Sequence, residues 1–434
     1  MLRKSRSINM KNINTIKVNF KGGIIPHIGL YNILLAAGKS GLLYVRFGLR
    51  QQLLLDIEII EVLDNVTAEL DMLGISYEIN KEDFPNIISS YPAEEVFIIN
   101  TWLDANVYHE IFEAINYRPR LKINISDTNQ SFTPLLTGNI NWVASPVEPH
   151  FWHLFIRFPK TNIVYEWQDV VATKDIAGMS LHIEKTILQD SEKFYDNNDA
   201  SGDELYQKVT TNTFNTKPAG GSLALPPFNL PYYEGLNRYN DKYWLGIYRR
   251  DELFSIEFLK AVCQLCINTQ SGQLCSTPWK TIIIKGIAEA NRNDWNHLLD
   301  KYQINIRHAA NELNFQVEDN SPEALKLKHH LVKHLNDDDT RTFGICVGIK
   351  TRKKSEVFSN ILVRRKALFT IGKWGFFYTY DILCAKEYNP NERTDFIFSS
   401  GNPKVVVAEQ LRRAVLSFYN YPANDDEDGS TWNE

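Results

Sequence analysis

The stretch VRFGLRQQLLLDI (residues 45–57) decides the fold, because a second stretch far along the chain repeats its pattern. It predicts a strand, a tight turn at Gly48-Leu49 and a second strand. Two arginines, Arg46 and Arg50, flank the turn. The sequence leaves two interpretations open for them. They line a site for an anionic group, or they pair with carboxylates as part of the structure.

The second copy of this stretch lies in the latter half of the chain. RQQLLLDI (50–57) aligns without a gap with KTIIIKGI (280–287). In this alignment Arg50 falls on Lys280, and the predicted turn falls on Pro278-Trp279. The chain is therefore expected to contain an internal repeat with one hairpin in each copy.

The segments around both hairpins predict the same order of elements, namely strand, helix, hairpin and helix. In the first copy they are IKVNFKGGIIP (16–26), HIGLYNILLAAGKSG (27–41), the hairpin and EIIEVLDNVTAELDMLGI (58–75). In the second they are KYWLGIYR (242–249), DELFSIEFLKAVCQLCINTQSG (251–272), QLCSTPWKTIIIKGI (273–287) and NRNDWNHLLDKY (291–302). This order predicts two ferredoxin-like half-domains that pair as a pseudo-twofold body.

The remaining segments predict two further mixed α/β domains, so the fold class is α+β. Between the copies, EEVFIIN (94–100) is an expected strand, and a Pro/Gly-rich connector (215–233) is expected to wrap a neighbouring surface. After the second copy, Ser321 is the expected N-cap of a helix that opens with Pro322. The expected segments are a flexible arm (1–14), the first half-domain (15–91), a central α/β domain (92–200), a linker (201–235), the second half-domain (236–318), a C-terminal α/β domain (319–422) and an acidic disordered tail (423–434).

Composition excludes several classes of protein. The 434 residues are 44% apolar and 23% charged, which is typical of a globular protein. A net charge of -5 argues against a nucleic-acid-binding protein, and the apolar runs are too interrupted to span a membrane. Five cysteines, an odd number, do not form a secreted disulfide framework. We therefore expect a cytoplasmic protein, whose oligomeric state the sequence does not give.

The repeat resembles the nitrite and sulfite reductase superfamily. The likeness rests on KGGIIP (21–26), VRFGLRQQLLLDI, PRLKINIS (119–126) and CSTPWKTIIIKGI (275–287). The TPWK step is similar to the precorrin-3B synthase branch, and some longer relatives carry a rubredoxin module. The resemblance implies two half-domains and two further domains that enclose sirohaem and a four-iron cluster, with a redox protein as partner.

The resemblance also implies which residues face the cofactor. Sirohaem carries many carboxylates, so a site for it needs several cations, and guanidinium groups suit this task. Arg46, Arg50, Lys122 and Lys280 occupy the matching positions and are the predicted set for sirohaem or another anionic tetrapyrrole. The sequence departs from the family at Asn19 and at Cys275-Ser276, where arginines are expected.

The thiolate ligands of the iron cluster are missing. The family holds its cluster with a C-x5-C pair and a C-x3-C pair in the last domain, because iron in such clusters binds soft sulfur. The last domain of this chain contains Cys346 and Cys384, far apart in sequence and each without a neighbouring cysteine. A conventional 4Fe-4S cluster is therefore not expected.

Three other patterns each have a structural and a functional interpretation. A metal site is one interpretation of Cys263, Cys266 and Cys275, but small core residues are the favoured one. Likewise, a metal could bind His330 and His334, beside His329, but a solvated basic helix is the favoured interpretation. The basic segment 348–366 contacts an anionic partner or is an exposed loop. The sequence therefore predicts no metal site.

Three functions remain as hypotheses. The first is a reductase-like protein of nitrogen or sulfur assimilation that acts as an accessory protein, an electron-transfer partner or a tetrapyrrole-binding protein. The second is a structural or protein-interaction scaffold without catalytic activity. The third is a sirohaem-dependent reductase with unconventional ligands.

Overall fold

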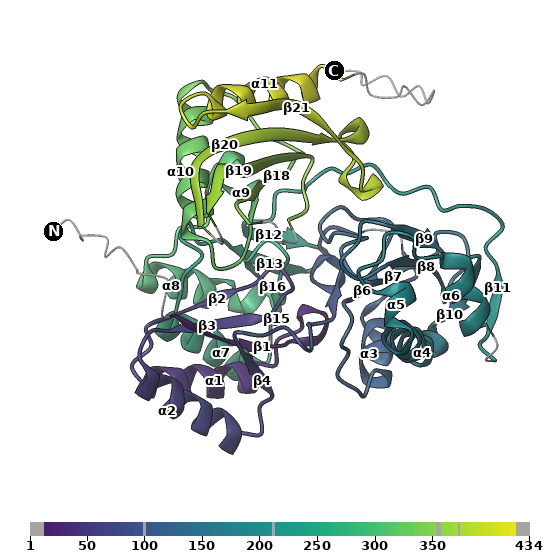
Figure 1. Ribbon diagram of the computed structural model, residues 1–434. Coiled ribbons are helices and arrows are strands. Elements are labelled where there is room, and N and C mark those ends of the chain that lie inside the picture. The colour runs from purple at the N-terminus through teal and green to yellow at the C-terminus, as the bar shows by residue number, and fades with distance from the viewer. Residues whose placement is uncertain (1–12, 99–100, 211–212, 353–356, 372–373, 422–434) are drawn as a thin grey trace, which may run out of the picture. The chain divides into compact units, whose positions relative to one another are not determined.

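The computed structural model describes residues 13–98, 101–210, 213–352, 357–371 and 374–421 (Figure 1). Nearly all of the predicted arm (1–14) and the whole predicted tail (423–434) lie outside the described residues. The chain divides into two compact units, Met1–Ala309 and Ala310–Glu434. None of the described helices combines the length and the apolar character that a membrane crossing requires.

The first half-domain has the predicted order of elements, because its apolar residues alternate in the strands and recur every three or four residues in the helices. Its sheet has the strand order β14-β2-β3-β1-β4, in which β14 (Phe254–Ser255) comes from the second copy. The elements are β1 (Asn14–Val18), a 3-10 turn η2 (Lys21–Gly23), α1 (His27–Lys39), β2 (Tyr44–Phe47), β3 (Leu53–Ile57), α2 (Ile60–Met72) and β4 (Tyr77–Ile79).

The second half-domain repeats this order with a sheet β12-β13-β16-β15, in which β16 and β13 take the places of β3 and β1. Its elements are β12 (Gly235–Tyr239), β13 (Lys242–Ile247), β14 (Phe254–Ser255), α7 (Ile256–Thr269), β15 (Gln273–Ser276), β16 (Ile282–Ala288), η5 (Glu289–Asn291) and α8 (Arg292–Tyr302). The order of elements predicted for both copies is thus confirmed.

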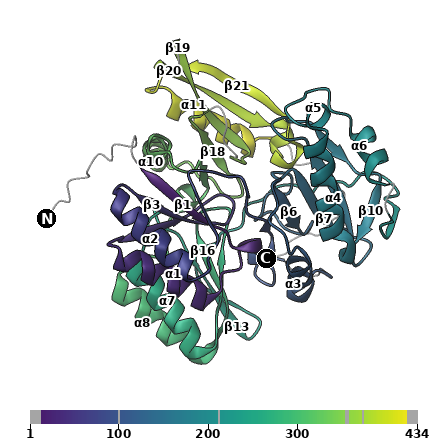
Figure 2. The same ribbon diagram turned by 60° about the horizontal axis from the view of Figure 1, so that its bottom comes forward.

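The two half-domains complete each other's sheets. β14, which precedes α7, pairs with β2 of the first half. In return, Ile24, which precedes α1, forms a bridge with Cys275 of β15, and the Ile25 amide donates to the Leu274 carbonyl at 2.9 Å. The helices α2, α1, α7 and α8 lie side by side in one layer (Figure 2). Apolar residues of both halves form one shared core beneath them.

Both hairpin turns are longer than the sequence suggested. The Gly48 amide donates to the Gln52 carbonyl at 2.8 Å, and the Thr277 amide donates to the Thr281 carbonyl at 3.0 Å, so each turn spans five residues. The predicted two-residue turn is therefore wrong. The longer turn allows side chains such as Arg50, which is only 3% exposed, to point into the protein.

The register of the repeat also differs from the gapless alignment. Each turn has one left-handed residue just before its last position, Gln51 (φ 59°) and Lys280 (φ 58°). Gln51 is therefore the counterpart of Lys280, and Arg50 is the counterpart of Trp279. The alignment of Arg50 with Lys280 is wrong by one position, because the apolar runs LLL and III can be superposed in either register.

The central domain carries a seven-stranded sheet in the order β11-β10-β8-β7-β6-β5, with β9 paired to β8. Helices α3, α4 and α6 cover one face of it through a large apolar core. The elements are β5 (Ile88–Ser89), α3 (Ala105–Ala114), β6 (Ile123–Ser126), β7 (Ile140–Ala144), β8 (Phe151–Arg157), β9 (Val164–Glu166), β10 (Asp169–Ala172), η4 (Thr173–Asp175), α4 (Ile176–Gln189), α5 (Ser191–Phe194), α6 (Gly202–Val209) and β11 (Thr216–Pro218).

The strand predicted at 94–100 is not formed where the chain is described. A 3-10 turn η3 (Tyr91–Ala93) is followed by turns up to Ile98, and residues 99 and 100 lie outside the described residues. Glu94 is buried here, and its carboxylate pairs with Lys285 of β16. A contact with a distant strand thus overrides the local β propensity.

The connector 215–233 wraps the central domain, as predicted. Its first residues form β11, which pairs with β10 at the sheet edge. Leu223 and Leu225 then pack on a small apolar cluster that includes Val143 and Phe155, on the sheet face opposite the helices. The connector therefore covers a face that would otherwise be open to solvent.

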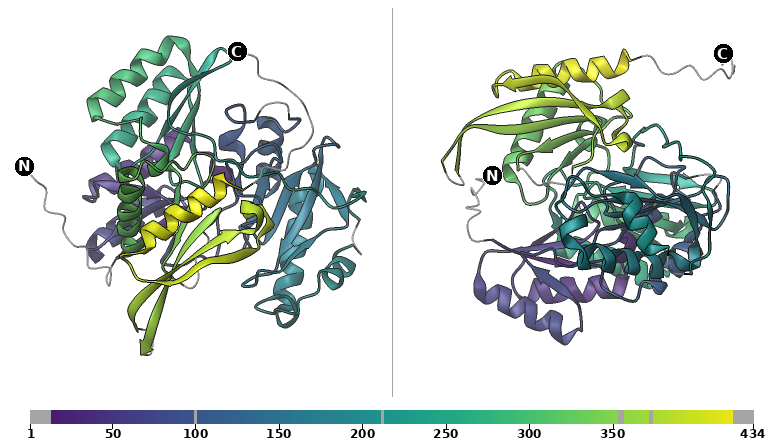
Figure 3. Two further views of the ribbon diagram at one scale, coloured as in Figure 1. Left: turned by 90° about the horizontal axis from the view of Figure 1, so that it is seen from above. Right: turned by 45° about the vertical axis from the view of Figure 1, so that its right-hand side comes forward.

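The second unit is a five-stranded mixed sheet in the order β17-β18-β19-β20-β21, with α10 and α11 packed against it around one core (Figure 3). Its elements are α9 (Ala310–Leu313), β17 (Phe315–Val317), α10 (Pro322–Asp337), β18 (Val347–Lys350), β19 (Ile361–Ile371), β20 (Trp374–Ala385), η6 (Lys386–Tyr388), η7 (Pro390–Glu392), β21 (Asp395–Asn402) and α11 (Val407–Tyr419). The predicted cap is confirmed, since Ser321 Oγ accepts from the Ala324 amide.

The Gly-Gly turn before α1 predicts a measurable stability effect. Gly23 has φ +77°, and a Cβ on it would lie 2.6 Å from the Ser276 carbonyl oxygen. We expect Gly23→Ala to lower the free energy of unfolding by about 3 kcal/mol, as backbone strain and overpacking add. Gly41 is the matched control, because it has φ +90° and open space around it. Gly41→Ala should cost about 1 kcal/mol. Equal losses in urea denaturation would contradict the role of the close contact.

Candidate functional site

The first hairpin turn directs Arg50 into the junction between the first half-domain and the central domain. Its Nη2 donates to the Asn86 carbonyl at 2.7 Å and to the Ile123 carbonyl at 3.3 Å. Its Nε donates to the Asn86 carbonyl at 3.2 Å. The guanidinium therefore joins the loop before β5 to the start of β6. Buried carbonyl groups need such donors, and Arg50 supplies them.

The next residue, Gln51, joins three parts of the first unit at the same point. Its amide pairs with the backbone of Ser89, donating to the carbonyl at 3.0 Å and accepting from the N–H at 2.9 Å. Its own carbonyl accepts from Ser276 Oγ at 2.7 Å. Gln51 is not among the residues predicted from the sequence. The available signal was a polar pair, Gln51-Gln52, at the buried end of an apolar strand.

The other three predicted cations also have partners within the chain. Arg46 of β2 pairs with Asp56 on the neighbouring strand β3, with Nε to Oδ2 at 2.7 Å. Lys280 is 5% exposed. Its Nζ lies 2.9 Å from an oxygen of Glu252, which is itself nearly buried. The fourth pair joins Lys122 to Glu82 at 3.5 Å, and both side chains are partly exposed. The structure thus gives each of the four predicted cations a separate partner.

An aromatic cluster fills the space between the second hairpin turn and the central domain. Trp279, the counterpart of Arg50, donates from Nε1 to the Phe132 carbonyl at 2.7 Å and stacks on Tyr233 at 6.0 Å between ring centroids. Phe97 lies 4.9 Å from Phe132 and 5.3 Å from Trp244 on the same measure. The second turn is therefore anchored by ring packing, where the first is anchored by hydrogen bonds.

A buried ion pair that the sequence did not indicate lies near this cluster. Lys285 of β16 pairs with the Glu94 carboxylate and donates to the Tyr91 carbonyl at 2.9 Å. Its Nζ also lies 3.7 Å from the centroid of the Tyr91 ring. Both charged side chains are at least nine-tenths buried. The pair holds the 91–98 segment against the second half-domain.

The five cysteines are free and buried. Burial raises the pKa of Cys263, Cys266, Cys275 and Cys384 to about 12, and it raises the pKa of Cys346 as well. Metal ligation requires the thiolate, so these environments favour the protonated thiol of a core residue. Cys263 and Cys266 belong to the shared core of the half-domains, whereas Cys275 belongs to the core of the central domain.

In the second unit, one of the three histidines lies in a group of side chains that could bind a metal ion. His334 lies near Asp338 and Glu409, with one ligand atom of each within 4.8 Å of the others. However, Glu409 already accepts from Arg412 at 2.8 Å and Arg413 at 3.0 Å. These two cations lower the pKa of Glu409 to about 2. The carboxylate is therefore already bound by two cations that a metal ion would have to displace.

The basic segment 348–366 is only partly described, since residues 353–356 lie outside the described residues. Two of its cations pair with one buried carboxylate, Asp381 of β20. Arg364 Nη2 lies 3.1 Å and Lys366 Nζ 2.5 Å from Asp381 Oδ2. Burial by itself raises the pKa of Asp381, but the two cations and the Gly401 amide outweigh it, so the pKa is lowered. These cations thus stabilise the long β19–β20 hairpin.

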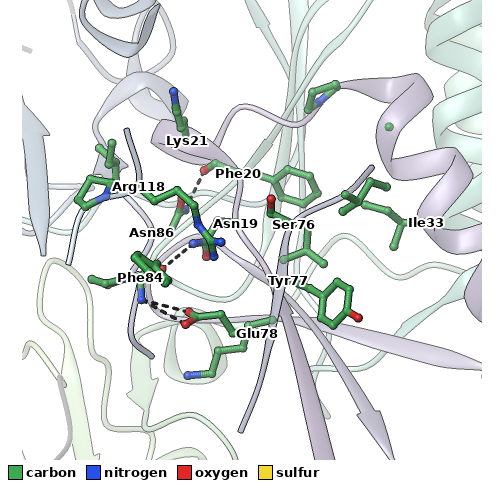
Figure 4. A pocket seen from close by; sticks show the side chains of 18 of the residues that line it. Asn19, Phe20, Lys21, Ile33, Ser76, Tyr77, Glu78, Phe84, Asn86 and Arg118 are labelled. Atoms are coloured by element: carbon green, nitrogen blue, oxygen red, sulfur yellow. Dashed lines mark hydrogen bonds between the residues drawn. The ribbon is translucent and has the colours of Figure 1, made fainter. Parts of the chain in front are cut away.

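One cavity of about 350 Å³ opens between β1, β4, the start of α1 and the loops 84–87 and 117–119 (Figure 4). We call it the β1–β4 cavity. Asn19 Nδ2 donates to the Phe84 carbonyl at 2.8 Å across its edge, and the Glu78 carboxylate accepts from the Phe84 amide at 3.2 Å. Arg46, Arg50, Lys122 and Lys280 do not line it. This cavity could not be predicted from the sequence, because five separated segments build it.

The chain has a nitrite/sulfite reductase-like fold. The solved structure of the NirA protein of Mycobacterium tuberculosis, a sulfite/nitrite reductase, matches it with a TM-score of 0.68 over 96% of this chain and 82% of NirA. The two sequences are 14% identical, so the likeness concerns the fold. No protein-family model and no curated protein sequence matches the chain. The reductase-like fold expected from the sequence is confirmed.

The position of Arg50 predicts a structural role that can be measured. We expect Arg50→Met to lower the free energy of unfolding by about 3 kcal/mol, because two buried carbonyls lose their donor. Lys39→Met is the control in the same unit. Lys39 is 61% exposed and 4.0 Å from Glu69, so its loss should cost less than about 0.5 kcal/mol. Urea denaturation measures both, and an Arg50 variant as stable as the control would refute the structural role.

The burial of the thiols predicts slow chemical labelling. A thiol with a pKa of about 12 is ionised in about one molecule in ten thousand at pH 8. We expect the native protein to react with Ellman's reagent at well under one equivalent within minutes. All five thiols should react after unfolding in guanidinium chloride. Rapid native labelling of Cys263, Cys266 or Cys275 would instead indicate an activated thiolate.

Proposed function

We propose that this chain is a nitrite/sulfite reductase-like accessory protein that acts as a structural and protein-interaction scaffold, and that its hairpin turns hold the body together instead of binding a tetrapyrrole. The observation that carries this proposal is the position of Arg50. Its guanidinium donates to backbone carbonyls inside the first unit. A cation in this position stabilises the fold, and a bound carboxylate would have to displace those contacts.

The partners of the other predicted cations support the same proposal. Sirohaem would need several cations directed toward its carboxylates. Arg46 and Lys280 are instead paired with Asp56 and Glu252. In this arrangement the predicted set of cations is directed toward protein groups and does not fit a ligand with many carboxylates. The aromatic cluster around Trp279, which stacks where the first turn has its arginine, further supports a structural role for the second turn.

The exchange of strands supports a second part of the proposal, namely that the half-domains form a pseudo-twofold ferredoxin-like pair. β14 is added to the first sheet from just before α7, and Ile24 is added to the second from just before α1. Each half therefore receives the equivalent segment of the other. A duplicated body of this kind offers a rigid platform for a partner.

One observation favours a second candidate function, the binding of an anionic tetrapyrrole. The fold matches that of NirA over 96% of the chain. In this candidate, Arg46, Arg50, Lys122 and Lys280 would exchange their present partners for carboxylates of the ligand. A reductase with unconventional ligands is the least supported function, since its clustered thiols lie in protonated, buried environments.

The reductase-like fold also guides the choice of partner. We propose a redox protein of nitrogen or sulfur assimilation, because an accessory protein that keeps a reductase body is suited to an enzyme of the same chemistry. The free cysteines fit a reducing compartment, which supports the cytoplasm as the place of action.

The proposal predicts that the freshly purified protein is colourless and lacks iron and sulfide. Sirohaem or the octacarboxylate uroporphyrin, added at about 10 µM, should show no shift of its Soret band, because the cations are already paired. Absorption spectroscopy measures this directly.

The opposite outcome is equally clear. A Soret shift that Lys122→Ala and Lys280→Ala remove would overturn the scaffold proposal and favour the tetrapyrrole site. Lys160→Ala is the matched control, because Lys160 forms an exposed ion pair with Asp196 away from the predicted set. A shift that all three variants retain would overturn both the scaffold and the predicted cation set.

A further inference from the structure

The β1–β4 cavity has the size and composition of a small-molecule site. Its volume of about 350 Å³ lies in the range that small ligands occupy in proteins. Its walls are mainly apolar and come from two strands, a helix and two loops. The apolar lining residues include Val18, Phe20, Ile33, Ile75, Ile87 and Pro119. An apolar body of a ligand would be shielded from water on several sides.

The charged residues of the lining have an excess of cations. Lys17, Lys21 and Arg118 line the cavity together with one carboxylate, that of Glu78. The Glu78 carboxylate also accepts from the Asp83 amide at 3.0 Å, so it is held on the 83–84 loop. The lining thus favours an anion over a cation.

Two of these cations are held in defined places. Lys21 Nζ donates to the Ile115 carbonyl at 2.6 Å and to the Phe112 carbonyl at 3.1 Å, at the end of α3. The guanidinium of Arg118 lies 4.2 Å from the centroid of the Phe84 ring (Figure 4). This stacking leaves the N–H groups at the edge of the guanidinium plane directed away from the ring. Arg118 is therefore suited to bind a carboxylate at the mouth of the cavity.

Two polar side chains of the lining do not offer their unpaired atoms to a ligand. The Tyr117 hydroxyl and Asn86 Oδ1 have no hydrogen-bond partner among the described residues, but both atoms are closed to a water-sized molecule. Tyr117 packs on the core of the central domain, and Asn86 Nδ2 donates to the Phe20 and Arg50 carbonyls at 2.7 and 2.8 Å. Recognition of a ligand in the cavity therefore falls to its apolar walls and to Arg118.

We propose that the β1–β4 cavity binds a small aromatic carboxylate. The aromatic body lies against Phe20, Ile33 and Ile75, and the carboxylate accepts from the guanidinium of Arg118. This site does not depend on the proposed scaffold function, because it shares no residue with the predicted cation set.

The test uses two probes of nearly equal size on the full chain. Indole-3-acetate has the aromatic body and the carboxylate, and tryptophol has an uncharged alcohol in place of the carboxylate. Isothermal titration calorimetry should show indole-3-acetate binding about five- to tenfold more tightly than tryptophol.

Variants locate the binding in the cavity. Gly29 of α1 lines it, and a Cβ there would meet only a Pro26 carbon at 3.6 Å. Gly29→Leu should therefore fold, with a better helix former, and fill the cavity, weakening indole-3-acetate at least tenfold. Gly178→Leu in α4 is the matched control, since Gly178 is also a helical glycine with an open position. It should leave affinity unchanged.

Arg118→Met separates the charged contact from the apolar ones. We expect it to weaken indole-3-acetate about fivefold and to leave tryptophol unchanged, since it removes the cation that binds the carboxylate. Because Arg118 is exposed, the variant should be about as stable as the parent. Equal affinity for tryptophol and indole-3-acetate would overturn the proposal. Unchanged binding to Gly29→Leu, or no binding of any probe at about 1 mM, would overturn it as well.

Discussion

The guanidinium of Arg50 and the amide of Gln51 are the interactions on which the first unit depends. Together they satisfy backbone groups of Asn86, Ser89 and Ile123, and the Gln51 carbonyl accepts from the second hairpin. The constraint is that polar backbone groups buried at a junction must find partners. A five-residue turn is long enough to bring two side chains to that junction. The cation is therefore explained by the architecture before any ligand is considered.

The sequence predicted the fold well where local pattern controls it. Local sequence patterns were sufficient to predict the elements of both copies of the repeat, the connector and the helix capped by Ser321. They were insufficient where a contact with a residue far along the chain determines the conformation. The register of the second copy depends on turn geometry that apolar runs do not encode, and the segment after Tyr91 is held as turns by the pairing of Glu94 with Lys285. A single sequence does not show either contact.

The candidate sites were less predictable, for a related reason. Residue type identified Arg46, Arg50, Lys122 and Lys280 as cations, but a cation binds a ligand or a protein oxygen according to what the fold places beside it. The lack of clustered cysteines in the last domain could be seen in the sequence, because the spacing of cluster ligands along the chain is a property of sequence. The β1–β4 cavity could not be seen there, since its lining residues are separated in the chain and meet only after folding.

The exchange of strands between the half-domains has a consequence for biosynthesis. β2 leaves the ribosome long before β14 is made, so the edge of the first sheet has no native neighbour while the whole central domain is being synthesised. An unpaired edge of this kind readily joins other chains. The first sheet of the nascent protein thus keeps an open edge at β2 until Phe254 and Ser255 have emerged. The same late closure means that truncating the chain before Phe254 would leave β2 at a permanently open sheet edge, which favours association with other chains.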